Sequence, residues 1–182
     1  MGKVSSGSAK RLSDRQVADF EHDGYLVLRG FASQDRCTTL DREIDLCLDP
    51  PLGPLELEAE LGYPGAPASV DQLGGQTPRR LLNAYSRGAP FRDWAREPTL
   101  VTAVVQLLGD VAIALVQAHH NCIMTKYPRF GSQTGWHQDI RYWSFERAVL
   151  VNAWLALGPE GPEQGGLRVL PGSHRLEISP ER

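Results

Sequence analysis

The sequence predicts a single α+β domain, mainly β, in which helices come first and an antiparallel β-barrel or β-sandwich follows. Apolar residues recur at helical spacing before residue 110. From residue 111 on, short runs of alternating apolar and polar residues are separated by turns that contain glycine and proline. Helices followed by short strands of this kind are typical of α+β folds.

The composition describes one globular domain and excludes several classes of protein. The 182 residues are 41% hydrophobic and 23% charged, which suits one packed domain at residues 13–182. Residues 1–12, rich in serine, glycine and lysine, are expected to be a disordered leader. A net charge of −3 without a basic cluster argues against nucleic-acid binding, and neither a membrane span nor a signal peptide is visible. Three cysteines form neither a disulfide framework nor a zinc pattern, so a cytoplasmic setting is expected.

Two helices and a short strand are expected near the N-terminus. A capping box at Ser13–Gln16 starts the first helix, and Asp23-Gly24 ends it. Ser33 caps a second helix that runs roughly from Gln34 to Leu48, with apolar residues recurring on one face. Between the two helices, Tyr25 to Leu28 is predicted to be a strand.

The middle of the chain combines a long loop with two further helices. Residues 49–79 are rich in proline and glycine, which predicts a loop that could close over a site as a lid. Arg79 to Tyr85 is a candidate strand. One helix should begin near Pro90, and another should run from Pro98 to Leu108 before Gly109 stops it.

The second half of the chain is expected to supply the β-structure. Val111 to Lys126 is long enough for one bent strand or two, and Ala148 to Leu157 alternates most clearly. Trp136 to Tyr142 and Leu167 to Leu170 complete the set. A tight turn at Pro171–His174 follows the last of them.

One pair of polar residues in this half points to chemistry. His137 and Asp139 are two residues apart in an aromatic neighbourhood, and in a strand such residues project to the same face. An imidazole and a carboxylate side by side are two of the three ligands in the facial triad that binds non-haem Fe(II). The alternative is a half-buried strand whose polar face carries a histidine and an aspartate without a metal.

Three segments, in order, resemble the phytanoyl-CoA dioxygenase family of Fe(II)- and 2-oxoglutarate-dependent oxygenases. Phe20–Phe31 is similar to the first helix and strand of that family. Thr125–Pro128 with Trp136–Asp139 is similar to its metal segment, and Gln164–Arg175 is similar to its Pro-Gly-Ser-His segment. The resemblance implies a double-stranded β-helix, also called a jelly roll or cupin-like fold, with helices at the N-terminus.

The resemblance also implies a site and a reaction. His137 and Asp139 would bind Fe(II), and Cys122 and Trp154 would lie against 2-oxoglutarate, the co-substrate. Arg141 is a candidate support for the ligands, with a surface arginine as the equal alternative. The reaction would consume O2, hydroxylate an unactivated C–H bond of a small organic molecule and release succinate and CO2, with ascorbate as an accessory reductant. Asp139 argues against halogenation, because halogenating relatives replace this carboxylate.

The sequence departs from the family pattern in one respect. Relatives supply a third iron ligand, and an arginine that binds 2-oxoglutarate, from positions well beyond the Pro-Gly-Ser-His turn, whereas this chain stops at Arg182. His174, the last histidine, is a weak substitute for the third ligand. The jelly roll is therefore expected to be incomplete at its C-terminus, and unpaired strand edges would favour a homo-oligomer.

Three hypotheses follow from these residues. The first is a dioxygenase that hydroxylates a small-molecule substrate. The second is a non-catalytic jelly-roll module or fragment with an incomplete metal site. The third is a cupin-like metal enzyme that uses no 2-oxoglutarate, and release of succinate would separate the first from the third.

Overall fold

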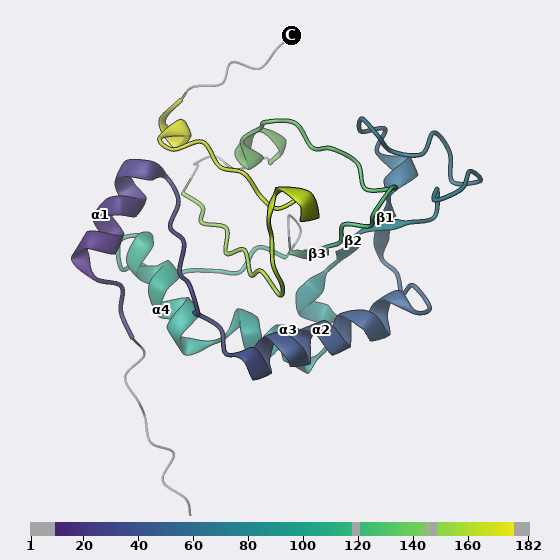
Figure 1. Cartoon of the computed structure of the whole chain (residues 1–182). Coiled ribbons are helices and arrows are strands. Elements are labelled where there is room, and N and C mark those ends of the chain that lie inside the picture. The colour runs from purple at the N-terminus through teal and green to yellow at the C-terminus, as the bar shows by residue number, and fades with distance from the viewer. Residues whose placement is uncertain (1–9, 118–120, 144, 146–148, 177–182) are drawn as a thin grey trace, which may run out of the picture.

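A computed structural model describes residues 10–117, 121–143, 145 and 149–176. Within these ranges the chain folds into four α-helices, several short 3₁₀ turns and one antiparallel sheet of three strands (Figure 1). The bounds are α1 Asp14–Asp23, α2 Gln34–Leu48, α3 Ala89–Ala95, α4 Pro98–Leu107, β1 Leu55–Leu57, β2 Pro78–Leu82 and β3 Cys122–Met124. None of the described helices has the length and apolar character needed to cross a membrane.

The predicted helices are confirmed, together with the signals that begin and end them. At the start of α1 the Ser13 hydroxyl accepts from the Gln16 backbone, and the Gln16 side chain accepts from the Ser13 N–H at 2.9 Å. Gly24 ends α1 in the left-handed conformation, with φ +80°. Ser33 caps α2, and proline occupies the first turns of both α3 and α4.

Helices α2 and α3 contribute the buried cluster of the molecule. Leu40 and Ile44 of α2 pack with Phe91 of α3. Cys47 of α2 is also buried. Leu155 and Leu157 of the irregular segment 149–157 pack against the same cluster. Leu48, Trp94 and Ile123 do so as well.

The sheet has β2 at its centre, with the order β1-β2-β3. Leu81 of β2 lies opposite Leu55 of β1 and Ile123 of β3, and its side chain is fully buried. Arg80 lies opposite Glu56, so a cross-strand ion pair forms on the other face of the sheet. The candidate strand that begins at Arg79 is thus confirmed in part as β2, whereas β1 lies in the segment predicted to be a loop.

Several other predicted strands are wrong. Tyr25 to Leu28, Leu167 to Leu170 and residues 149–157 are irregular, and Trp136 to Tyr142 contains a 3₁₀ helix at Asp139–Tyr142. Of the described part of Val111 to Lys126, β3 alone is a strand. Alternating residues show that a segment has two unlike faces, but a strand also needs a neighbour to which its N–H and C=O groups can bind.

The described residues therefore confirm the α+β class, but neither the predominance of strands nor the double-stranded β-helix. Most of the expected leader lies outside the described ranges. Its last residues contact α4, since Leu12 exchanges backbone hydrogen bonds with the Gln106 side chain and Arg11 pairs with Asp110. As a result α1 lies beside α4 at one end of the molecule (Figure 1).

Candidate metal centre

His137 and Asp139 come together at the start of the 3₁₀ helix Asp139–Tyr142. The His137 Nε2 atom lies 3.3 Å from Asp139 Oδ1, and both side chains are about seven-tenths buried, with 29% and 28% exposure. The expected strand is absent here, but Gln138 between them has extended backbone, with φ −109° and ψ 128°. Residues on either side of an extended residue project to the same side, which explains the contact.

The His137 ring is oriented by a backbone carbonyl. Its Nδ1 atom lies 2.8 Å from Gly135 O, and its ring packs edge-on against Tyr142 with centroids 5.7 Å apart. A carbonyl oxygen only accepts, so this hydrogen bond requires a proton on Nδ1, and Nε2 is the ring nitrogen that faces Asp139. Metal-binding histidines are commonly oriented in this way, with the second nitrogen donating to a carbonyl or carboxylate.

Asp139 is oriented by an amide. Its Oδ2 atom accepts from Asn152 Nδ2 at 2.6 Å, which leaves Oδ1 directed at His137. Asn152 was missed as a site residue, because the sequence places it among the outward residues of an apolar run. The signal for it was its amide, which stands alone among the apolar residues of 149–157.

The geometry of the pair fits a cation. Two acceptor atoms 3.3 Å apart repel unless a proton or a metal ion lies between them. Two ligands at roughly 2.1 Å from one ion and at right angles to each other are about 3.0 Å apart. His137 Nε2 and Asp139 Oδ1 therefore fit two adjacent positions around one ion with a small adjustment.

A third ligand does not join them in the described part of the chain, which contains no group of three histidine, cysteine or acidic side chains able to bind a metal. The alternative that His174 completes the site is contradicted. His174 Nε2 lies 3.2 Å from Glu21 O at the end of α1, so this imidazole contacts α1. His120 and the Arg141 side chain lie outside the described residues.

Cys122 lies on β3 in the electrostatic neighbourhood of the pair. Burial raises the pKa of its thiol, the Arg80 guanidinium opposes that change, and the Glu56 and Asp139 carboxylates add to it. The thiol is therefore neutral at pH 7. Trp154 is half-exposed and its indole N–H donates to both Glu160 oxygens, at 3.0 and 3.2 Å.

Arg80 is a residue that the sequence analysis did not assign. Its Nε lies 2.6 Å from Glu56 Oε2, an ion pair that is not aligned as a hydrogen bond, and its guanidinium also interacts with the Cys122 thiol. It is the basic group that acts on the Cys122 thiol. The alternation of β2 could have identified it, because Arg79 and Arg80 must face opposite sides of the sheet.

Gln138 links the pair to the turn at residues 171–175. Its Nε2 atom donates to Ser173 O at 2.8 Å and to Leu176 O at 3.1 Å. That turn in turn contacts the end of α1, where Gly172 N donates to Asp23 O at 2.8 Å.

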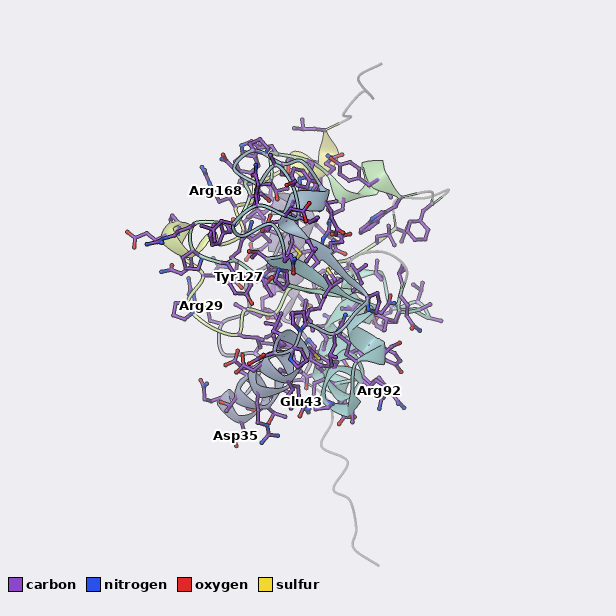
Figure 2. The ribbon with its side chains drawn as sticks, turned by 90° about the vertical axis from the view of Figure 1, so that its right-hand side faces the viewer. Arg29, Asp35, Glu43, Arg92, Tyr127 and Arg168 are labelled. Atoms are coloured by element: carbon purple, nitrogen blue, oxygen red, sulfur yellow. The ribbon has the colours of Figure 1, made fainter. Side chains whose placement is uncertain are left out.

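The pair lies at the end of the molecule remote from α2 and α3. Figure 1 shows the 3₁₀ helix that begins at Asp139 at the top of the molecule, with α2 and α3 at the bottom. In the view turned by 90°, Arg168 lies near the top, well away from Asp35 of α2 and Arg92 of α3 (Figure 2). The Arg168 guanidinium stacks on the ring of Trp136, 5.3 Å from its centroid, and Trp136 directly precedes His137.

The family model for phytanoyl-CoA dioxygenase (PhyH) matches residues 20–182. No solved structure gave a significant match.

Curated relatives are similar over nearly the whole chain. An ectoine dioxygenase of Sphingopyxis alaskensis is 27% identical over 172 residues, which cover 92% of this chain and 52% of the relative. An ectoine dioxygenase of Bordetella parapertussis is 27% identical over 94% of this chain and 52% of the relative. Phytanoyl-CoA dioxygenase domain-containing protein 1 of Bos taurus is 26% identical, with 92% of this chain and 67% of the relative covered. The chain thus spans about half the length of the ectoine dioxygenases.

Proposed function

The chain belongs to the phytanoyl-CoA dioxygenase family, and on that premise we propose that it functions as an Fe(II)- and 2-oxoglutarate-dependent dioxygenase. The reaction is hydroxylation of an unactivated C–H bond in a small organic molecule, with release of succinate and CO2. The observation that supports it best is the pairing of His137 Nε2 with Asp139 Oδ1 at 3.3 Å, each oriented by a partner on its far side.

Each residue of the centre has a defined task in this proposal. His137 and Asp139 bind the iron, while the Gly135 carbonyl and the Asn152 amide keep the two ligand atoms directed at it. Binding of iron at His137 Nε2 requires that this atom carry no proton. When bound, Fe(II) and 2-oxoglutarate supply the oxidative chemistry that O2 drives.

The co-substrate is assigned to the side of the centre that Cys122 occupies. 2-Oxoglutarate is a dianion, and Arg80 provides the positive charge beside the Cys122 thiol. Because the Cys122 thiol is neutral, it does not repel the 2-oxoglutarate dianion. Trp154 extends this surface in the proposal, with its indole fixed by Glu160.

The remaining features of the proposal concern the protein as a whole. We infer a double-stranded β-helix built on one domain at residues 13–182, a cytoplasmic setting and a homo-oligomeric state. The substrate is a small molecule. Ectoine, which two of the relatives are named for, is the first compound to test.

An anaerobic titration tests the metal centre. The chain is titrated with Fe(II) and 2-oxoglutarate, and the visible charge-transfer band of the chelated co-substrate is followed. The band should appear, His137→Ala should abolish it, and His22→Ala should not, because His22 is an exposed side chain on α1. Failure of the band to appear would favour a non-catalytic jelly-roll module instead, and its persistence in His137→Ala would show that His137 does not hold the iron.

A further inference from the structure

A buried ion pair binds the segment that leads to the candidate metal centre. Arg79 of β2 and Glu58 are 2% and 0% exposed, and Arg79 Nη1 lies 3.4 Å from Glu58 Oε2. The guanidinium also lies 4.5 Å from the centroid of the Tyr63 ring. Its two terminal nitrogens donate to the hydroxyls of Ser132 and Thr134, the latter at 2.7 Å.

Ser132 is held at three atoms by charged groups. Its N–H donates to Glu58 Oε2 at 3.1 Å, its hydroxyl accepts from Arg79, and its carbonyl accepts from Lys126 Nζ at 2.8 Å. We call Glu58, Arg79 and Lys126 the Ser132 clamp. Ser132 is itself 3% exposed, so these contacts are shielded from water.

Stability alone is a poor explanation for the Ser132 clamp. Burying an ion pair costs desolvation energy, and the attraction between the charges offsets that cost only when the geometry is good. Apolar residues of similar volume often give the folded chain the same stability or more. Here Glu58 Oε1 and Arg79 Nε are buried without a hydrogen-bond partner in the described part of the chain, which adds to the cost. The best-attested use of buried ionic groups is to fix one arrangement of the chain.

The arrangement that this clamp fixes is the segment leading to the metal pair. Thr134 is bound to Arg79, and the next residue, Gly135, supplies the carbonyl that orients the His137 ring at 2.8 Å. A shift of the Gly135 carbonyl would release the Nδ1 proton and allow the ring to turn. Arg79 and His137 are thus connected through Thr134 and Gly135, which are adjacent in the sequence.

We propose that Arg79 is a positioning residue for the metal centre, acting through Ser132 and Thr134 on the carbonyl that orients His137. This inference rests on the proposed function. It adds a residue that touches neither the metal pair nor Cys122, and it assigns to the buried ion pair the task of pre-organising one iron ligand.

The test removes one hydroxyl at a time and leaves the ion pair intact, because Arg79→Met would strand a buried carboxylate and risk unfolding. Thr134→Val keeps the shape of the side chain and removes the acceptor for Arg79. Thr134→Ser restores it. Thr125→Val is the matched control, since the Thr125 hydroxyl donates to the Pro78 carbonyl of β2 at 2.6 Å and not to the residues that directly precede His137.

Two readouts are needed. The first is the affinity for Fe(II) in the presence of 2-oxoglutarate, which Thr134→Val should lower about tenfold, the usual effect of losing support for a ligand. The second is the tautomer of His137 in the metal-free chain, read from long-range ¹H–¹⁵N spectra and assigned with His137→Gln. Thr134→Val should lower the population in which Nδ1 carries a proton bonded to the Gly135 carbonyl, whereas Thr134→Ser and Thr125→Val should match the wild type.

The two readouts separate this inference from the proposed function. An unchanged tautomer and an unchanged Fe(II) affinity in Thr134→Val, and in a second variant Ser132→Ala, would overturn the positioning role even if both variants were less stable. If the wild-type chain binds no Fe(II), the proposed function fails, and the tautomer spectra still decide whether Arg79 positions His137.

Discussion

Replacing Gly24 with alanine is predicted to detach the turn at residues 171–175 from α1. Gly24 has φ +80°, and a Cβ atom added to it would lie 2.1 Å from Nδ1 of His174 and 2.6 Å from its Cγ. No rotation of the new methyl group relieves this overlap, because a Cβ position is fixed by the backbone. The His174 ring must move away from the end of α1, and the turn that carries it must move as well.

The cost has two parts that the structure separates. The left-handed backbone costs an alanine about 1 kcal/mol. Moving the turn breaks the hydrogen bonds from Gly172 N to Asp23 O at 2.8 Å and from Arg175 Nη1 to His22 O at 2.7 Å. At about 1 kcal/mol each, the expected total for Gly24→Ala is about 3 kcal/mol.

Gly30→Ala isolates the first part. Gly30 has φ +63°, but no atom lies within 4 Å of the position that its Cβ would take. It should therefore lose only about 1 kcal/mol of the free energy of unfolding. Urea unfolding followed by circular dichroism measures both variants, and at roughly 2–4 °C per kcal/mol the difference is also visible in Tm.

The combination of Gly24→Ala with His174→Ala completes the comparison. Removing the imidazole makes room for the new methyl group, so the two changes should be less than additive by 1 kcal/mol or more. Equal losses in Gly24→Ala and Gly30→Ala, or strict additivity with His174→Ala, would show that the turn does not dock on α1 in solution. Docking on α1 would then not explain why His174 is absent from the candidate metal centre.

Three further predictions concern the centre itself. Asn152→Ala should lower the affinity for Fe(II) about tenfold, since it removes the 2.6 Å hydrogen bond to Asp139, and calorimetric titration would contradict this if the affinity were unchanged. Gln138→Ala should weaken Fe(II) binding and destabilise the chain together, because its amide joins the metal pair to the Ser173 and Leu176 carbonyls, whereas loss of stability with full affinity would refute the link. Burial raises the pKa of the Cys122 thiol, so the stability that this thiol contributes is present below the ordinary thiol pKa and is lost as the pH rises through the raised value. For the same reason, iodoacetamide at pH 8 should alkylate Cys122 more slowly than a thiol of the unfolded chain. Alkylation of Cys122 should become faster in urea.

The parts of the fold that the sequence predicts are those decided by neighbouring residues. Ser13, Gly24 and Ser33 begin and end helices through contacts within a few residues, and each was placed correctly. The proximity of His137 and Asp139 is equally local, because it needs only one extended residue between them. It was found for the right reason although the strand around it was wrong.

The parts that could not be predicted depend on contacts between distant residues. The carboxylate of Asp139 is oriented by Asn152, and the hydroxyl of Thr134 is bound by Arg79 on another strand. Neither contact leaves a spacing in the sequence. The segment 149–157 shows the same limit, since Leu155 and Leu157 pack against the cluster of α2 and α3 although the described residues give this segment no strand partner.

The two arginines of β2 limit where residues can be inserted into or deleted from this chain. Arg79 faces the segment before His137 and Arg80 faces Glu56 and Cys122, and their separation rests only on the alternation of side chains along a strand. Residues gained or lost between Gly62 and Gln76 would alter the loop and leave that alternation intact. A single residue gained or lost within β2 would instead exchange the two guanidiniums between the faces of the sheet, so natural variants of different length should tolerate change in the loop and retain an uninterrupted β2.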